Sequence, residues 1–183
     1  MILLYCVAAV VLFVLVLLIR TLRFRPRPQP QVTTFPEPPQ FEYDSVADHL
    51  SRMVRIPTVS NRDASKVDAK RFEEFRTLLE TVYPAVHASC ERTLIGESGL
   101  VYHWKGRDPE QPTVLMAHYD VVAADPAEWD RPPFSGEIDD SGVLWGRGSI
   151  DTKVTLCAIL EAVELRIASG FVPARDVYLS RSE

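Results

Sequence analysis

The first 19 residues form an unbroken apolar run. Met1 to Ile19 contains no charged side chain and consists mostly of Val, Leu, Ile and Ala. As a helix, this run is about 28 Å long, close to the hydrocarbon thickness of a bilayer. It lacks the basic start, the short apolar core and the small-residue cleavage site that are typical of a signal peptide. We therefore predict a transmembrane anchor over residues 1–19, with a cleaved signal peptide as the alternative.

A basic, proline-rich segment follows the apolar run. Four arginines lie between residues 20 and 27, and six of the fourteen prolines lie in residues 25–40. Proline fixes φ and removes a backbone donor, so residues 20–40 are predicted to be an extended linker. The arginines follow the apolar run, which favours a cytoplasmic position for the rest of the chain, with a secretory or lumenal position as the alternative.

Residues 41–183 show the alternation of helical and strand patterns that is typical of a globular domain. Apolar residues recur at three- and four-residue spacing in three segments, which predicts helices over residues 44–56, 65–82 and 152–168. Short apolar runs predict strands over residues 86–91, 100–104, 113–118, 143–145 and 176–179. Val114 to Ala117 suggests a strand buried on both faces, as in a parallel sheet. Helices alternating with apolar strands indicate an α/β layered domain.

Composition and charge narrow the range of functions. Hydrophobic residues make up 46% of the chain and charged residues 25%, as in globular proteins. Residues 1–40 carry a net charge of +3 and the remainder −8, and an acidic body argues against nucleic acid as a partner. The three cysteines form no C-x-x-C pair and indicate neither a disulfide framework nor a thiolate metal site. We expect them to be small buried residues.

Three residues in two segments carry the candidate chemistry. His118 and Asp120 end an apolar strand and share one of its faces, as a metal ligand and its orienting carboxylate would. Asp151 follows a second apolar segment and opens a helix, so it is either a metal ligand or an N-cap. Since sites in open α/β sheets form at the carboxyl ends of strands, His118 and Asp151 can converge on a Zn²⁺ site.

Three linked motifs carry a family resemblance. They are residues 116–122 (Met-Ala-His-Tyr-Asp-Val-Val), the segment from Trp129 to Gly136, and residues 145–153 (Trp-Gly-Arg-Gly-Ser-Ile-Asp-Thr-Lys). In this order and spacing they resemble family twenty of the metallopeptidases, nearest to its carboxypeptidase S and N-fatty-acyl-amino-acid hydrolase branch, which also includes aminoacylases. Residues 56–60 and 170–173 match the same branch. The resemblance covers residues 45–180.

The resemblance implies a di-zinc hydrolase of amide or peptide bonds with a zinc-exopeptidase-like three-layer domain and a mostly parallel sheet. It implies that His118 binds one zinc, that Asp151 bridges both ions, and that Asp120 orients the His118 ring. The substrate would be an N-acyl amino acid or a small peptide. Arg147 and Lys153 lie near the site in sequence and either face a substrate carboxylate or have structural or solvated roles.

The sequence departs from the family after the strand predicted at 176–179. There the family continues into two glutamates, a general base and a zinc ligand, whereas this sequence reads Ser180-Arg-Ser-Glu183. We expect an N-terminal part of a catalytic domain over residues 41–183 that is inactive alone and dimerises only with the family's second domain. The alternatives are a non-catalytic, membrane-anchored binding module and a truncated gene product. The other histidines match no family ligand: His49, His87 and His103.

Overall fold

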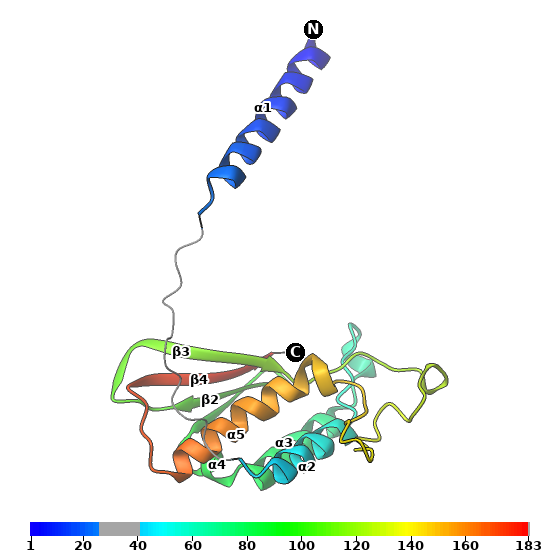
Figure 1. Ribbon diagram of the computed structural model, residues 1–183, viewed down its shortest axis with the longest axis vertical. Helices are drawn as coiled ribbons and strands as arrows, with labels where there is room; N and C mark the ends of the chain where they lie inside the picture. Colours follow the sequence, from blue (N-terminus) through cyan, green and yellow to red (C-terminus); the bar gives the residue numbers. More distant parts are fainter. Residues whose placement is uncertain (26–40, 183) are drawn as a thin grey trace. The chain divides into compact units, whose positions relative to one another are not determined.

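A computed structural model describes residues 1–25 and 41–182, and residues 26–40 of the predicted linker lie outside this range. The chain divides into two units, residues 1–40 and 41–183. In the first unit, helix α1 (Ile2–Arg23) contains a stretch with a mean hydropathy of 2.6 that is long and apolar enough to cross a membrane (Figure 1). Signal sequences share this property. Cys6 is exposed on this helix, so the expectation that all three cysteines are buried is wrong.

The second unit is built on a four-stranded mixed sheet. Its strands are β1 (Glu91–Ile95), β2 (Gly99–Trp104), β3 (Asp108–His118) and β4 (Arg175–Ser182), in the spatial order β1-β2-β4-β3. The β1–β2 and β2–β4 pairs are antiparallel, and only β3 and β4 run parallel. The expected mostly parallel sheet is therefore not confirmed.

Four helices pack on one side of this sheet: α2 (Tyr43–Arg55), α3 (Ala69–Val82), α4 (Pro84–Ser89) and α5 (Val154–Ala168) (Figure 1). Three of them confirm predicted helices: α2 is shifted by one residue from its predicted range, and α3 and α5 begin later than predicted. Short helical turns lie at Ala64–Lys66 (η1), Pro126–Glu128 (η2) and Ser149–Lys153 (η3). Within the described residues the second unit has two layers, so the expected third layer is not formed there.

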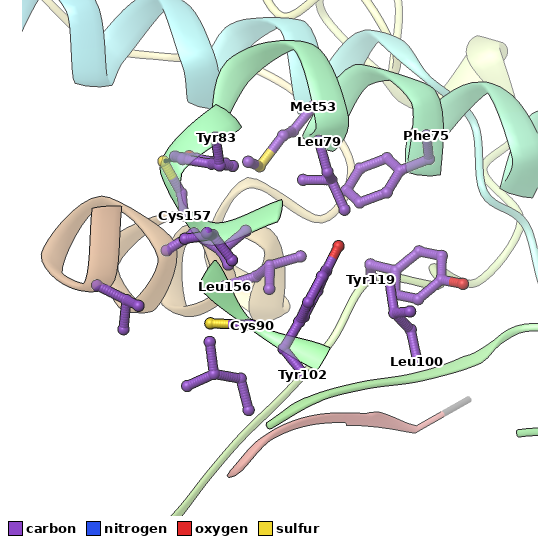
Figure 2. Packing of buried hydrophobic residues seen from close by; sticks show 14 of the residues in the cluster. Met53, Phe75, Leu79, Tyr83, Cys90, Leu100, Tyr102, Tyr119, Leu156 and Cys157 are labelled. Atoms are coloured by element: carbon purple, nitrogen blue, oxygen red, sulfur yellow. Dashed lines mark hydrogen bonds between the residues drawn. The ribbon is translucent and has the colours of Figure 1, made fainter. Parts of the chain in front are cut away.

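The hydrophobic core lies between the helices and the sheet. Alternate residues of β2 point into it, including Leu100 and Tyr102, while α3 contributes Phe75 and α5 contributes Leu160. Figure 2 shows Phe75 against Tyr119, whose rings stack with centroids 4.9 Å apart. Tyr119 directly follows β3, so this contact fixes the end of that strand against α3.

One predicted strand is wrong because a helix start is stabilised there. Residues 84–89 form α4, and β1 begins only at Glu91. Pro84 occupies the first turn of α4, where its missing N–H and fixed φ favour a helix. The Glu164 carboxylate accepts hydrogen bonds from the N–H groups of Ala85 and Val86, both at 2.8 Å. Residues far along the chain therefore decide this local structure.

Two other strand predictions are corrected by the observed strand pairing. The strand expected at 143–145 contributes only an isolated bridge between Ile138 and Leu144. The run expected to be buried on both faces lies in β3, which is an edge strand in the described part of the chain. Val114, Leu115 and Met116 are 53%, 37% and 63% exposed. An apolar run shows that burial of these side chains would be favourable, but the neighbouring strands and layers decide whether they are buried.

We expect the core between α5 and the sheet to dominate the stability of the second unit. Leu160→Ala should lower the free energy of unfolding by about 2–5 kcal/mol, because it opens a cavity at a fully buried position. Leu94→Ala, at a half-exposed position on β1, should cost about 0.5 kcal/mol or less. Urea unfolding of the full chain in detergent micelles, followed by tryptophan fluorescence, measures both. Equal losses would mean that this core is not the main source of stability.

Candidate functional site

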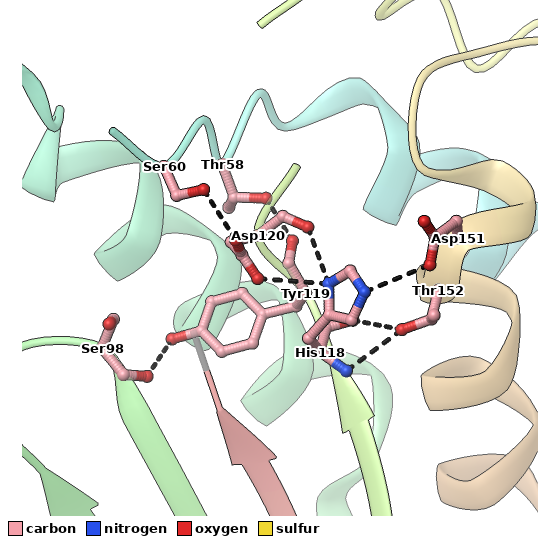
Figure 3. Close-up of polar contacts among 8 residues, drawn as sticks. All are labelled: Thr58, Ser60, Ser98, His118, Tyr119, Asp120, Asp151 and Thr152. Carbon is pink, nitrogen blue, oxygen red and sulfur yellow. Dashed lines mark hydrogen bonds and ion pairs between the residues drawn. The ribbon is translucent and has the colours of Figure 1, made fainter. Parts of the chain in front are cut away.

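His118 is the last residue of β3, and its ring is oriented by Asp120. Its Nδ1 lies 3.1 Å from the Asp120 carbonyl oxygen and 3.1 Å from Asp120 Oδ1 (Figure 3). Only the carbonyl contact has hydrogen-bond geometry, and Asp120 Oδ1 is buried without a hydrogen-bond partner. Because both groups of Asp120 are acceptors, the proton of a neutral imidazole belongs on Nδ1. The lone pair of Nε2 then points away from Asp120.

Asp151 meets this lone pair from the other side. Its Oδ1 lies 3.2 Å from His118 Nε2, and its carboxylate is 83% exposed (Figure 3). An imidazole lone pair and a carboxylate oxygen repel each other unless a proton or a metal cation lies with them. The nitrogen and oxygen donors also match the preferences of Zn²⁺. The two residues therefore fit a metal site in chemistry, although they supply only two ligands.

The backbone before α5 is tied directly to β3. Thr152 Oγ1 donates to the His118 carbonyl oxygen at 2.8 Å and accepts from the His118 N–H at 3.0 Å. This double contact fixes Asp151 beside His118. The alternative role of Asp151 as an N-cap is not found, because α5 has no side-chain cap. Sequence reasoning missed Thr152, whose position directly after Asp151 was the only signal.

The segment that follows α2 binds Asp120 and the residue before it. Ser60 Oγ donates to Asp120 Oδ2 at 2.7 Å, and the buried Thr58 hydroxyl donates to the Tyr119 carbonyl (Figure 3). Backbone bonds from Ser60 to Val121 and from Val121 to Thr58 join the same two segments. The sequence indicated a role for residues 56–60 near the site only through the family resemblance. In the structure this segment supports the residue that orients His118.

The Lys153 side chain points into the protein interior. It is fully buried, and its Nζ donates to the carbonyl oxygens of Met53 at 2.9 Å and Ile56 at 2.8 Å. Burial lowers the pKa of Lys153 to about 7, and the nearby Asp120 carboxylate partly opposes this shift. The ammonium binds carbonyl groups at the C-terminal end of α2, where helices leave acceptors without intrahelical partners. The structural role considered for Lys153 is therefore the one observed.

His118, Asp120 and Asp151 line one hollow of about 470 Å³. Trp129, Trp145 and Arg147 lie in its walls. Within residues 1–25 and 41–182, no group of three or more His, Cys, Asp or Glu side chains is arranged to hold a metal ion.

The other three histidines have partners elsewhere in the body. His49 pairs with Glu161 at 2.6 Å, and His103 pairs with Asp176 at 2.7 Å. His87 lies 2.6 Å from the Tyr102 hydroxyl. None of them lines the hollow that contains His118.

A family profile and several known proteins are similar to this region. The sequence profile described as Peptidase family M20/M25/M40 matches residues 114–180. The chain is 37% identical over 165 residues to carboxypeptidase S of Saccharomyces cerevisiae, and 36% identical over 149 residues to the N-fatty-acyl-amino acid synthase/hydrolase of Bos taurus. These matches cover 85% and 78% of this chain but only 28% and 29% of the two relatives. The chain thus spans less than a third of their length.

Solved structures share the fold. A family M20 metallo-carboxypeptidase from Sulfolobus solfataricus superposes with a TM-score of 0.59 at 20% identity, covering 78% of this chain and 31% of that chain. Human carnosine dipeptidase 1 superposes with a TM-score of 0.57 at 18% identity, covering 76% and 31%.

We expect the buried hydrogen bond from the Thr58 hydroxyl to the Tyr119 carbonyl to contribute more to the free energy of unfolding than an exposed hydrogen bond of the same kind. Thr58→Val should lower the free energy of unfolding by about 1–2 kcal/mol, because the Tyr119 carbonyl loses a buried donor. In the control Thr81→Val, the lost hydroxyl donates to the Thr77 carbonyl at an exposed helix position, and the change should stay within about 0.5 kcal/mol. Urea unfolding of the full chain measures both, and a Thr58→Val effect no larger than the control would contradict this role.

Proposed function

We propose that this chain, whose residues 114–180 match the profile of peptidase family M20/M25/M40, contributes to zinc-dependent hydrolysis of amide or peptide bonds. The proposed substrate is an N-acyl amino acid or a small peptide, consistent with the activities named for the two relatives, carboxypeptidase S and the N-fatty-acyl-amino acid synthase/hydrolase. The chain spans less than a third of the length of those relatives. The catalytic activity of a complete enzyme is therefore proposed for this chain and not taken over from them.

One observation carries the proposal. His118 Nε2 and Asp151 Oδ1 face each other at 3.2 Å, and neither atom carries a hydrogen to donate when the proton of the neutral ring is on Nδ1, beside Asp120. Residues 33 positions apart have been brought together by Thr152, which bonds both backbone groups of His118. A structural pair would be expected to be buried or to have complementary donors, whereas the Asp151 carboxylate is exposed. The arrangement suits a cation held by both side chains.

The roles of this chain's residues follow from their contacts. His118 and Asp151 would hold zinc, and the exposed Asp151 carboxylate has a second oxygen for another ion. Asp120 keeps the Nδ1 proton of His118 in place, so that Nε2 remains a ligand. Ser60 fixes Asp120 in turn. Bound zinc would supply Lewis acidity for the scissile carbonyl and would lower the pKa of a water molecule.

The ligand count limits what these residues do alone. A zinc site needs three or four protein ligands, and the described residues offer His118 and Asp151. We propose that further ligands and the general base are contributed by other residues. Helix α1 would serve as a membrane anchor for the body, in keeping with its length and composition.

The proposed zinc ligands are tested by metal titration of the tag-free full chain in detergent micelles. Zinc should shift the His118 ring resonances in NMR spectra. His118→Ala and Asp151→Ala should remove this binding, and Asp120→Ala should weaken it by about tenfold because the ring loses its orienting group.

The His103–Asp176 pair provides a matched control. It is also an imidazole and a carboxylate, but Asp176 is almost fully buried and already accepts from the Gly106 N–H. His103→Ala should leave zinc binding unchanged. Equal zinc binding by the Asp151→Ala chain would remove Asp151 from the proposed site.

We expect the 183-residue chain by itself to show no zinc-dependent hydrolysis of N-acetyl-L-leucine above the buffer rate, because two ligands do not form a complete site. Release of free leucine, followed by a colorimetric amine assay, measures this. Hydrolysis that depends on zinc and disappears in His118→Ala would show that the missing groups are present in this chain.

A further inference from the structure

Arg147 is the one residue of the hollow whose charge has no partner. Its Nε is buried without a hydrogen bond, and its guanidinium forms no ion pair among the described residues. It lies over the Trp129 ring, with the guanidinium carbon 5.0 Å from the ring centroid. Partial burial of a cation costs free energy, and contact with an aromatic ring returns only part of it. A guanidinium left in this state can gain much from an anionic ligand.

A second arginine in the same region shows the contrast. Arg131 also lies over an indole, that of Trp145, at 4.8 Å. Its guanidinium, however, is paired with Glu137 at 2.5 Å and lies 3.8 Å from Asp139. Two arginines thus stack on two tryptophans, and only the one lining the hollow beside His118 lacks an acidic partner.

The backbone holds Arg147 firmly in place. Glycines precede and follow it, and a Cβ on Gly146 or Gly148 would lie 2.3 Å from a Val54 methyl or 2.5 Å from a Val121 methyl. The Arg147 N–H donates to the Pro133 carbonyl at 2.6 Å. Because the Arg147 backbone is fixed and its guanidinium lies on the Trp129 ring, the side chain loses little conformational entropy when it binds a ligand.

The remaining walls of the hollow are mostly apolar, and its other charged residues are acidic. Asp120 and Asp151 lie at the end that contains His118. The volume of about 470 Å³ is that of a small-molecule site. The apolar lining consists of Val121, Val122, Val143, Leu144 and Ile150, together with the two tryptophans.

This geometry points to Arg147 as the residue that binds a carboxylate of the substrate, while the apolar walls take its side chain. The inference rests on the proposed function, because the amide to be cleaved would lie at His118 and Asp151. It narrows the substrate to an N-acyl amino acid with an apolar side chain and an ionised carboxylate. Guanidinium and carboxylate form paired, charge-assisted hydrogen bonds, which would give the site its specificity.

The test compares N-acetyl-L-leucine with N-acetyl-L-leucinamide, which differ only in the carboxylate. The full chain in detergent micelles is titrated with each in metal-free buffer and followed by the NMR signals of the Arg147 Nε–H and the Trp129 indole N–H. The acid should bind about tenfold or more tightly than the amide, and the Arg147 signal should shift only with the acid. Equal affinities in the native chain would overturn the inference.

Variants separate substrate binding from a structural role of Arg147. Arg147→Gln should reduce the preference for the acid to within about twofold, whereas the control Arg131→Gln should keep it. Arg147→Lys retains a cation and should keep part of the preference for the acid. If the Arg147→Gln chain does not fold, this variant still tests whether the preference depends on the side chain at position 147. A preference that persists in folded Arg147→Gln would also overturn the inference.

Failure of this inference is distinguishable from failure of the proposed function. The titration needs no metal, so it does not depend on zinc binding by His118 and Asp151. Carboxylate binding without any zinc binding would leave a binding site and remove the hydrolase proposal. Zinc binding without preference for the acid would keep the hydrolase proposal and remove the role of Arg147.

Discussion

The buried ammonium group of Lys153 connects the parts of the molecule that build the site. It donates to the carbonyl groups of Met53 and Ile56, so the end of α2 and the start of α5 are held together. An ammonium buried in this way is costly, as its lowered pKa indicates. Its two carbonyl partners, the nearby Asp120 carboxylate and the Phe75 ring at 5.1 Å offset that cost. The position of Asp151, two residues before Lys153, depends on this attachment.

The same attachment reaches His118 by a second route. The end of α2 leads directly into residues 56–60, where Thr58 and Ser60 bind Tyr119 and Asp120. His118 is thus held through Asp120 on one side and through Thr152 on the other. Both supports start from residues close to Lys153 or bonded to it. The site is therefore positioned by the packing of α2 and α5 as much as by the end of β3.

The charge distribution gives the hollow two different ends. Asp120 and Asp151 make the end beside His118 acidic, which suits metal cations. Arg147, held between two glycines and over Trp129, makes another part of the wall cationic. Opposite charges in one small hollow can orient a substrate that carries a polar amide and an anionic group. Apolar side chains form most of the remaining lining.

The sequence by itself determined the helices α2, α3 and α5, because their apolar spacing is strong. Its motifs also predicted that His118, Asp120 and Asp151 act together, and the structure brings these three residues to one hollow. Only the tertiary structure decided that residues 84–89 are helical, since Glu164 caps them from α5. It likewise decided that β3 is an exposed edge strand and that Lys153 is buried while Arg147 lines the hollow. Local pattern reports a residue's own preferences, whereas burial and pairing depend on which distant segments fold against it.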